Sequence, residues 1–404
     1  MSVAACHNKL AAQAREDAPV GPGRRVLVAM SGGVDSSLAA VVLRDAGCEL
    51  VGVNMRTHRI TPEEKALGAR IRTCCSPVDA RDARACAEAT GFPFYVLDVE
   101  PAFERDVIAP FIDAYASGRT PNPCVLCNNH VKLGALLDKA RVYGCEYVAT
   151  GHYARKERHP STGRWALRRA ADTNKDQCYY LAGLTQEQLA LILFPLGGMT
   201  KPEVREAAAQ AGLVTAAKPE SQEICFVPDN DHRAFLRRRF AARGTAMPRG
   251  RLLTTRGEDL GEHEGVAFYT IGQRRGLGIA AGEALYVVDI DADRNNVILG
   301  RREECLFTGL LARGMNWMAI EGLRAERRAL VQVRHRHAAA PARLLPGEDP
   351  AEARVVFDQP VAAVAPGQAV VFWDEQGFVL GGGWIERGER SSPAFPADTA
   401  PQAG

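Results

Sequence analysis

Residues 26–37 read VLVAMSGGVDSS, and this stretch decides the fold class of the chain. Its apolar first half predicts a buried strand, and the glycines after Ser31 permit positive φ angles and let backbone amides approach an anion. A helix then begins near Asp35, where free amides and the helix dipole favour phosphate. Because no Lys-Ser or Lys-Thr pair follows the glycines, this is not the Walker pattern. The stretch therefore predicts a phosphate-binding turn, and the simpler alternative is a tight turn without a ligand.

The first half of the chain alternates between strand and helix patterns. Further apolar runs predict strands at 48–55, 92–99 and 145–153, and helical spacing is found at 34–47, 77–91 and 130–144. Such alternation predicts an α/β domain built on a doubly wound parallel sheet. Ligands of these sheets bind at the carboxyl ends of the strands, where the motifs SGGVDSS, NMRTH and GHY are expected.

The pattern changes near residue 226. Residues 231–256 contain eight arginines and one acid, Asp231, which predicts either a surface that binds phosphates or a solvated basic helix. The arginines are Arg233, Arg237, Arg238, Arg239, Arg243, Arg249, Arg251 and Arg256. After about residue 302 the apolar runs become short and β-rich between Asp, Gly and Pro turns. This part predicts a small antiparallel barrel or sandwich.

Composition narrows the class of protein. The 404-residue chain is long enough for two or three domains, and 46% hydrophobic and 24% charged residues are typical of a globular protein. The net charge of +2 creates no global field toward nucleic acid, so any basic surface must be local. We expect no signal or transit peptide, and no apolar run approaches the roughly 18–20 residues that span a bilayer. A cytoplasmic protein without a membrane partner is expected.

The cysteines raise a separate question. Their number, 11, is odd and no export signal is expected, so a structural disulfide framework is not predicted. Cys124 and Cys127 stand three apart in RTPNPCVLCNN, a spacing that suits zinc, an iron–sulfur cluster, disulfide exchange or a sulfur nucleophile. The adjacent Cys74 and Cys75 are expected to be non-catalytic. Four others are expected to be buried fillers: Cys48, Cys86, Cys145 and Cys305.

Several blocks of the sequence together resemble one family. SGGVDSS is similar to the PP-loop of the adenylating N-type ATP pyrophosphatases, and later blocks are similar to those of the bacterial tRNA-uridine 2-sulfurtransferase family, MnmA. These blocks are GRTPNPCVLCN, ATGHYAR, DTNKDQCYYL, FPLGGMTKPEVR, ESQEICF, YTIGQRRGLGI and PVAAVAPGQAVVF. They occur in the family's order from about residue 24 to 387, which is the whole chain apart from its tails.

The resemblance implies three domains. We expect a PP-loop ATP-binding catalytic domain at 24–226, a small central tRNA-contacting domain at 227–301 and a C-terminal antiparallel β-barrel at 302–388. Disordered tails are expected at 1–23 and 389–404.

The resemblance also implies a reaction, the ATP-dependent 2-thiolation of the wobble uridine of tRNA. ATP with Mg²⁺ adenylates the C2 carbonyl oxygen, a sulfur species attacks C2, and AMP and pyrophosphate are released. The step is chemically reasonable, because a carbonyl oxygen is a poor leaving group until AMP is attached to it. The implied partners are tRNA, a sulfur-donor protein or sulfide source, and a reductant.

Family matches imply two groups of binding residues. The ATP site comprises Ala29, Met30, Ser31, Gly32, Gly33, Val34, Asp35, Ser36, Met55 and Gly151. The tRNA contacts comprise His152, Lys175, Asp176, Gln177, Arg334, His335 and Gln368, with Asn122, Pro123 and Cys124 at the target base. This chain has His335 where many relatives carry tyrosine, so a stacking contact with RNA is altered here.

The resemblance assigns the sulfur chemistry to two cysteines. Cys127 matches the catalytic nucleophile, and Cys225 matches the cysteine that carries a persulfide; transfer leaves a disulfide between them that must be reduced. Cys124 departs from the family, because many relatives have aspartate there. Three alternatives follow: Cys124, Cys127 and Cys225 hold a [4Fe–4S] cluster with one open iron, only the persulfide pair acts, or Cys124 is a spectator or zinc ligand.

Two other functions compete with tRNA thiolation. A PP-loop ligase or amidotransferase that adenylates a small molecule would explain the loop but not the cysteines, the arginines or the barrel. A zinc-stabilised RNA-binding module without catalysis would leave the Asp35 loop unexplained. AMP formation that depends on tRNA would distinguish the thiolase from both.

Overall fold

The computed structural model describes residues 21–57, 77–219, 224–227, 231–245, 247–279 and 282–390. The pair Cys74–Cys75 lies outside the described residues, as do the expected tails apart from 21–23, 389 and 390. Within the described part of the chain, no helix has the length and apolar character needed to cross a membrane.

A five-stranded sheet forms the first domain, and every neighbouring pair in it is parallel. The strand order is β3-β2-β1-β4-β7, with β1 innermost. The strands are β1 (Arg25–Ala29), β2 (Glu49–Arg56), β3 (Phe94–Asp98), β4 (Tyr147–Ala149) and β7 (Ile192–Leu193). The predicted doubly wound parallel sheet is therefore confirmed.

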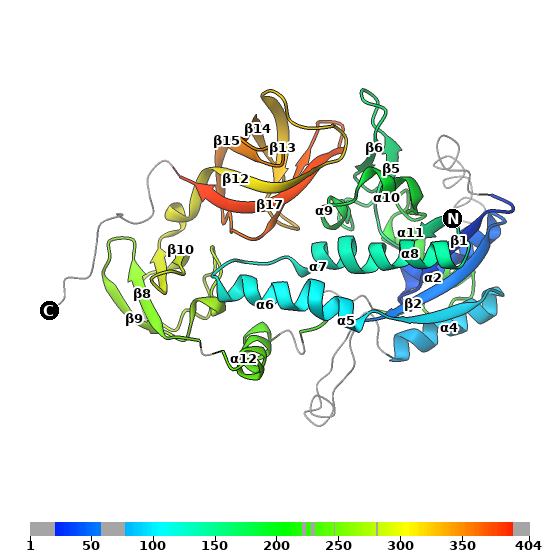
Figure 1. The fold of residues 1–404 in the computed structure, drawn as a ribbon, viewed down its shortest axis with the longest axis horizontal. Helices are drawn as coiled ribbons and strands as arrows, with labels where there is room; N and C mark the ends of the chain where they lie inside the picture. The colour runs from blue at the N-terminus through cyan, green and yellow to red at the C-terminus, as the bar shows by residue number, and fades with distance from the viewer. Residues whose placement is uncertain are drawn as a thin grey trace.

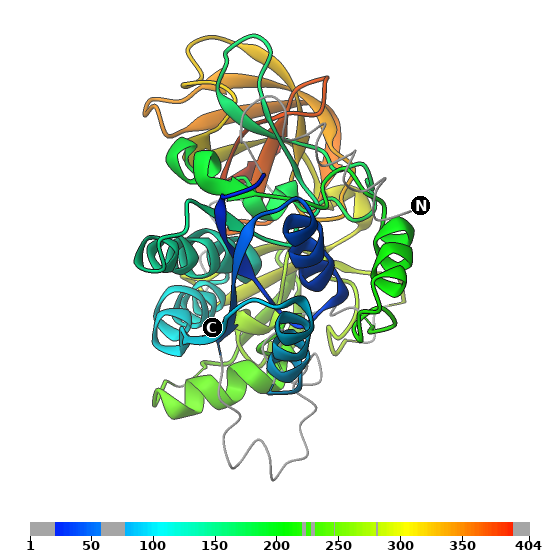
Figure 2. The same cartoon turned by 90° about the vertical axis from the view of Figure 1, so that its right-hand side faces the viewer.

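Helices cover both faces of this sheet (Figure 2). One face packs against α2 (Val34–Asp45), α4 (Pro77–Thr90) and α11 (Lys201–Gln210), whose apolar residues share one core with β1. The other face packs against α8 (Leu133–Val142), where Leu133 and Leu136 are fully buried. The strand ends next to α2 and α8 are thus enclosed by helices, which shapes a site at that edge.

A long helical path leaves the sheet toward the other domains (Figure 1). It passes out along α5, a π-helical turn and α6, and returns along α7, a second π-helical turn and α8. The elements are α5 (Glu100–Phe103), η1 (Glu104–Ile108), α6 (Ala109–Ala116), α7 (Pro123–Leu126) and η2 (Cys127–Lys132). A hairpin and two short helices complete the domain: β5 (Arg155–Arg158), β6 (Trp165–Arg168), α9 (Cys178–Leu181) and α10 (Gln186–Leu191).

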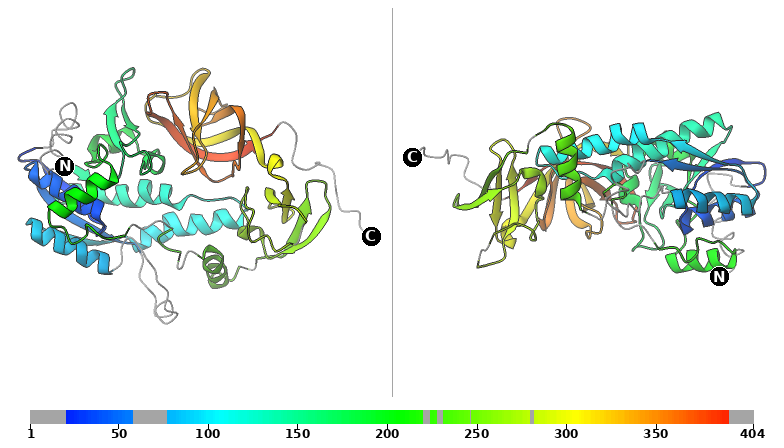
Figure 3. Two further views of the ribbon diagram at one scale, coloured as in Figure 1. Left: turned by 180° about the vertical axis from the view of Figure 1, so that it is seen from behind. Right: turned by 90° about the horizontal axis from the view of Figure 1, so that it is seen from below.

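The central part of the chain begins with α12 (His232–Ala242) and forms a four-stranded sheet of order β10-β11-β8-β9. Its β11–β8 pair is parallel and the other two pairs are antiparallel. Its elements are β8 (Gly250–Thr254), β9 (Asp259–His263), η4 (Val266–Phe268), β10 (Tyr286–Asp291), β11 (Asn296–Gly300) and η5 (Arg302–Cys305). The β8–β9 ribbon and the first parallel sheet lie at opposite ends of the molecule (Figure 3).

The C-terminal part is a closed antiparallel barrel of order β12-β15-β14-β13-β16-β17. The strands are β12 (Leu306–Trp317), β13 (Arg327–Gln332), β14 (Ala340–Pro346), β15 (Ala353–Ala362), β16 (Ala369–Trp373) and β17 (Val379–Glu389). The sequence patterns predicted either a barrel or a sandwich. The strands pair in a closed ring, so the domain is a barrel. Large barrel side chains such as Phe372, Trp373 and Leu380 are fully buried.

The barrel packs closely on the first domain beside α9. The side-chain amide of Asn316 on β12 donates hydrogen bonds of 2.9 Å to the carbonyls of both Ala182 and Leu184. On β17, a Cβ added at Gly382 would lie 2.7 Å from the Cβ of Ala182. A glycine is therefore needed on β17 for this close approach.

We predict that Gly382→Ala lowers the melting temperature, because overpacking a tight contact typically costs about 1–3 kcal/mol. The matched control is Gly322→Ala, since a Cβ at Gly322 has no atom within 4 Å. Differential scanning calorimetry of both variants measures the effect. Equal melting temperatures for the two variants would mean that the barrel does not depend on this contact.

Candidate functional site

The phosphate-loop sequence folds as a turn between β1 and α2, and its two glycines have different roles. Gly32 has φ of +74°, and a Cβ there would lie 2.1 Å from the carbonyl oxygen of Asp79. Gly33 is extended, with φ of −93°, and a Cβ there would meet only Ser31 Oγ at 3.5 Å. Of the two glycines, which both permit positive φ, only Gly32 turns into the left-handed region.

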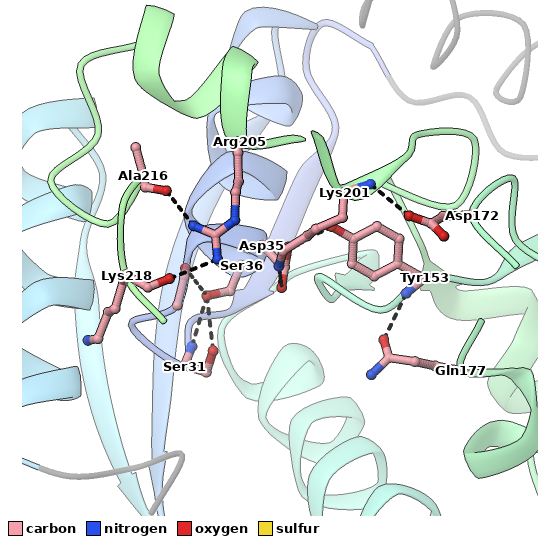
Figure 4. Close-up of polar contacts among 11 residues, drawn as sticks. Ser31, Asp35, Ser36, Tyr153, Asp172, Gln177, Lys201, Arg205, Ala216 and Lys218 are labelled. Carbon is pink, nitrogen blue, oxygen red and sulfur yellow. Dashed lines mark hydrogen bonds and ion pairs between the residues drawn. The ribbon is translucent and has the colours of Figure 1, made fainter. Parts of the chain in front are cut away.

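Ser36 in the first turn of α2 stabilises the loop through hydrogen bonds (Figure 4). Its hydroxyl accepts from the amide of Ser31 at 3.1 Å and lies 3.2 Å from the Ser31 hydroxyl. It also donates to the carbonyl of Gly33 at 3.2 Å. These bonds hold Ser31 and Gly33 against the first turn of α2.

Asp35 in that first turn is held by two side chains that the sequence analysis did not single out (Figure 4). Lys201 Nζ donates to both carboxylate oxygens at 2.7 and 2.8 Å, and the Tyr153 hydroxyl donates to Oδ1 at 2.7 Å. Lys201 is 7% exposed and is the first residue of α11, where the helix dipole disfavours a cation. A lysine at the first position of a helix needs a nearby carboxylate. This position was the signal in the sequence that could have identified Lys201 as a site residue.

A cavity of about 350 Å³ opens between the loop, Asp35 and helix α8. Nine of the ten residues implied for ATP line it: Ala29, Met30, Ser31, Gly33, Val34, Asp35, Ser36, Met55 and Gly151. Three residues implied for tRNA, His152, Lys175 and Gln177, line the same cavity. The fold thus brings both predicted groups to one space, at the carboxyl ends of the parallel strands.

Asn54 and Lys218 also line this cavity and were missed. The amide of Asn54 donates to the Met30 carbonyl at 2.7 Å, and its buried Oδ1 has no partner among the described residues. Lys218 Nζ donates to Asp79 and Asp82. Burial alone would lower the pKa of Lys218, but these two carboxylates raise it above the ordinary value.

The segment implied for tRNA at 175–177 has mixed roles. The Gln177 side chain accepts from the amide of Tyr153 at 2.9 Å, which supports the tyrosine that holds Asp35. The carboxylate of Asp176 accepts from the amides of Ala170 and Cys178 at 2.7 and 3.1 Å. Burial raises the pKa of Asp176. Asp176 is therefore engaged in shaping the turn.

His152 lies at the end of β4 with its Nδ1 2.8 Å from the Thr150 hydroxyl. His152 is half-buried and lines the cavity. Burial of the ring, and then the Lys132 cation, hold the pKa of His152 far below its ordinary value. His152 is therefore a neutral hydrogen-bonding group at physiological pH.

The segment with the cysteine pair meets the barrel. Asn122 caps α7 by accepting from the Val125 amide at 3.3 Å, and its side-chain amide donates to Gln368 Oε1 at 3.3 Å. Gln368 in turn donates to the Pro121 carbonyl at 3.3 Å. Two residues implied for tRNA, 246 positions apart, thus meet at this contact.

A third implied tRNA group lies at the same junction. The His335 ring packs 4.5 Å from the Tyr180 ring, centroid to centroid, and Arg334 beside it is exposed. Tyr180 was not singled out; burial and then the nearby Cys124 raise its pKa. The His335 ring is tilted by 36° against this tyrosine of the first domain, so two aromatic rings meet at the junction.

The three cysteines named for sulfur chemistry lie in different settings. Cys127 begins η2 and is 6% exposed, whereas Cys124 in α7 and Cys225 are half-buried. Within the described ranges, which include all three, no group of three His, Cys, Asp or Glu side chains is positioned to hold a metal ion. The residues therefore do not fit a three-thiolate cluster as they are arranged here.

The arginine-rich stretch is largely neutralised by acids. Arg239 donates to Glu104 at 3.0 and 2.8 Å, and Arg243 donates to Asp113 at 2.5 Å. Three more are paired: Arg237 with Glu264, Arg249 with Glu262, and Arg251 with Asp259 and Glu262. Arg238 is exposed and has no acidic partner among the described residues. Five of the eight arginines that could have bound phosphates are therefore paired with acids.

Comparison with known sequences covers nearly the whole chain. Profiles match for the tRNA methyl transferase HUP domain at 24–229, the tRNA methyl transferase PRC-barrel domain at 234–301 and the aminomethyltransferase beta-barrel domain at 307–385. The chain is 48% identical over 368 residues to tRNA-specific 2-thiouridylase MnmA of Acidobacterium capsulatum, covering 89% of this chain and 98% of the relative. Identity is 50% over 368 residues to the protein of that name from Symbiobacterium thermophilum, covering 90% and 92%.

Among solved structures, the U34-tRNA thiolase NcsA from Methanococcus maripaludis with its [4Fe-4S] cluster aligns over 55% of this chain and 67% of its own. The TM-score is 0.37 and the identity 16%, and nothing further rests on that likeness. The sequence matches are the decisive ones, since they extend through all three parts of the chain in order. The chain belongs to the MnmA family of tRNA-specific 2-thiouridylases.

Proposed function

We propose that this protein is a tRNA-uridine 2-sulfurtransferase that uses ATP to replace the 2-oxygen of the wobble uridine with sulfur. One observation carries the proposal: the cavity faces the phosphate loop on one side and Lys132, Leu133 and Leu136 on the other. These residues belong to the continuous helical segment 123–142, which contains Cys127. A nucleotide in the cavity would therefore lie against the helix that carries the proposed nucleophile.

In the first chemical step, the uridine 2-oxygen attacks the α-phosphorus of ATP, and pyrophosphate leaves. Backbone amides at Gly33 and at the start of α2 would hold the phosphates, because a helix N-terminus favours negative charge. Mg²⁺ would be held there by substrate phosphates together with Asp35 or Asp79, the carboxylates that line the cavity, in exchange for the lysine that each of them pairs with here. Mg²⁺ would neutralise phosphate charge there.

In the second step, the terminal sulfur of a Cys225 persulfide attacks C2 of the uridine, and AMP leaves with the former 2-oxygen. The Cys127 thiolate then attacks the inner sulfur of Cys225, so the Cys225 persulfide bond breaks and a Cys127–Cys225 disulfide forms. Sulfur stays on the base. A reductant restores both thiols, and a sulfur-donor protein reloads Cys225. No step is routed through an iron–sulfur cluster, because the three thiols are not gathered as ligands.

The residues implied for tRNA fall into two groups in this proposal. His152, Lys175 and Gln177 would contact the target nucleotide at the cavity, whereas Asn122, Pro123, Cys124, Arg334, His335 and Gln368 would contact the anticodon at the barrel junction. Asp176 is assigned to the turn instead. We also infer domain boundaries at 24–226, 227–301 and 302–388, which separate the parallel sheet, the central sheet and the barrel.

The activity is tested with ATP, a persulfide donor and two tRNA transcripts that differ only in a wobble uridine or cytidine. We expect AMP and 2-thiouridine only with the uridine transcript. AMP formation without tRNA would instead favour a small-molecule ligase, and failure to hydrolyse ATP would favour a non-catalytic RNA-binding module.

We predict that Asp35→Ala eliminates thiolation. The change removes a carboxylate from the cavity and leaves the Lys201 ammonium, 7% exposed, without its ion-pair partner. The control is Asp45→Ala at the exposed C-terminal end of the same helix, which should keep activity. Nucleoside mass spectrometry measures the product. Normal product from Asp35→Ala would place the phosphate chemistry elsewhere.

We predict that Cys127→Ser and Cys225→Ser each abolish 2-thiouridine while ATP binding stays intact, since transfer and resolution need two thiols. Cys124→Ser should retain product, because it belongs to neither step, and Cys145→Ser is a buried control outside the site. Iron and zinc analysis of anaerobically purified enzyme accompanies the assay. If Cys124→Ser lost both iron and activity, a mechanism that uses a cluster would replace the proposed mechanism that uses the persulfide pair.

We predict that Arg238→Ala flattens the salt dependence of tRNA binding, whereas Arg239→Ala does not. The free guanidinium of Arg238 can neutralise a phosphate, and each lost phosphate contact reduces the log–log slope by about 0.7–0.9. Arg239 already pairs with Glu104 and serves as the matched neighbour. Filter binding over a range of salt concentrations measures both slopes. Equal slopes for wild type and Arg238→Ala would show that α12 does not touch the RNA.

A further inference from the structure

Lys218 takes no part in the proposed reaction steps. It lies after α11, and its ammonium contacts three acceptors: the Gly32 carbonyl at 2.9 Å, Asp79 Oδ1 at 2.6 Å and Asp82 Oδ2. An ammonium has three N–H donors. All three are therefore engaged by protein oxygens, and Lys218 has none left for a direct bond to phosphate.

The bond to Gly32 sets the orientation of one peptide group. A trans peptide is planar, so the N–H of Gly33 points opposite to the carbonyl of Gly32. Lys218 draws that carbonyl toward α4, which carries Asp79 and Asp82. Gly33 lines the cavity. Holding the carbonyl in this direction turns the Gly33 amide away from α4, where it can meet an anion.

Two further contacts fix this arrangement. The backbone of Asp79 packs so tightly on Gly32 that a Cβ there would lie 2.1 Å from the Asp79 oxygen. On the other side, Arg205 of α11 donates to the carbonyls of Ala216 and Lys218 at 2.8 and 3.0 Å (Figure 4). The Gly32–Gly33 peptide is thus held between α4 and a turn that α11 supports.

We propose that Lys218 is a positioning residue for phosphate binding, which orients the Gly33 amide toward the polyphosphate of ATP without touching it. The inference rests on the proposed use of ATP. It predicts a selective effect: loss of Lys218 weakens the binding of phosphate groups and spares the binding of the nucleoside.

The test is isothermal titration calorimetry of Lys218→Met with MgATP and, separately, with adenosine. We expect ATP affinity to fall about tenfold or more, the size of one charge-assisted hydrogen bond, and adenosine affinity to stay within about twofold. In the thiolation assay the KM for ATP should rise more than kcat falls. The conservative variant Lys218→Arg should recover part of the ATP affinity, because a guanidinium can bond to the same three acceptors.

Two variants serve as controls. Arg205→Gln keeps the ammonium but frees the turn, so it should shift ATP affinity in the same direction by a smaller factor, and it carries the test if Lys218→Met does not fold. Lys139→Met on α8, outside the cavity lining, should leave both affinities unchanged.

An equal loss of ATP and adenosine affinity would overturn the proposal, since it indicates collapse of the whole pocket. A lower melting temperature with unchanged ATP affinity would overturn it as well, because the role would then be purely structural. If wild-type enzyme binds ATP but makes no 2-thiouridine, the proposed function fails, and the ratio of ATP to adenosine affinity still decides the role of Lys218.

Discussion

The ion pair between Lys201 and Asp35 is the interaction on which the site depends. It joins the first turn of α2 to the first residue of α11, 166 positions later, and the Tyr153 hydroxyl joins the same carboxylate. A lysine that is 7% exposed would be costly without a partner, so the pair fixes how α11 lies against the phosphate loop. Because Gln177 supports Tyr153, the segment implied for tRNA is connected to the loop implied for ATP.

The barrel provides a second constraint on the same chemistry. The amide of Thr120 donates to the Pro366 carbonyl at 2.8 Å, Asn122 meets Gln368, and Arg119 pairs with Glu386 at 2.9 Å. The segment that leads into Cys124 and Cys127 is therefore fixed by the C-terminal domain. An RNA that contacts the barrel would act directly on the helical segment that contains Cys127, the proposed nucleophile.

Sequence patterns predicted the parts of the structure that depend on local periodicity. Strand–helix alternation was sufficient for the parallel sheet, and the glycine turn was sufficient to locate the loop that lines a cavity at the carboxyl edge of this sheet. Patterns could not decide between a barrel and a sandwich, because closure depends on pairing between β12 and β17, far apart in the chain. They also could not separate Gly32 from Gly33, since the φ angles follow from the packing of α4.

Long-range partners account for the remaining differences. Lys201, Lys218 and Arg205 gain their roles from groups that only folding brings near, and the arginines of α12 lose much of their free charge to Glu104, Asp113 and Glu264 in the same way. The cysteine trio shows the converse, because three thiols that suggest a cluster in sequence are not gathered as ligands in space. The number of arginines or cysteines in a sequence therefore gives the charges and ligands that could act together. The fold decides which of them are close enough to do so.

The central claim is that ATP activates the uridine oxygen itself, and an isotope experiment tests it most directly. A tRNA whose wobble uridine carries heavy oxygen at C2 is thiolated by the enzyme, and the released AMP is analysed by mass spectrometry. The account predicts that the heavy oxygen appears in the phosphate of AMP, in an amount equal to the 2-thiouridine formed. Unlabelled AMP together with thiolated tRNA would contradict adenylation of the base.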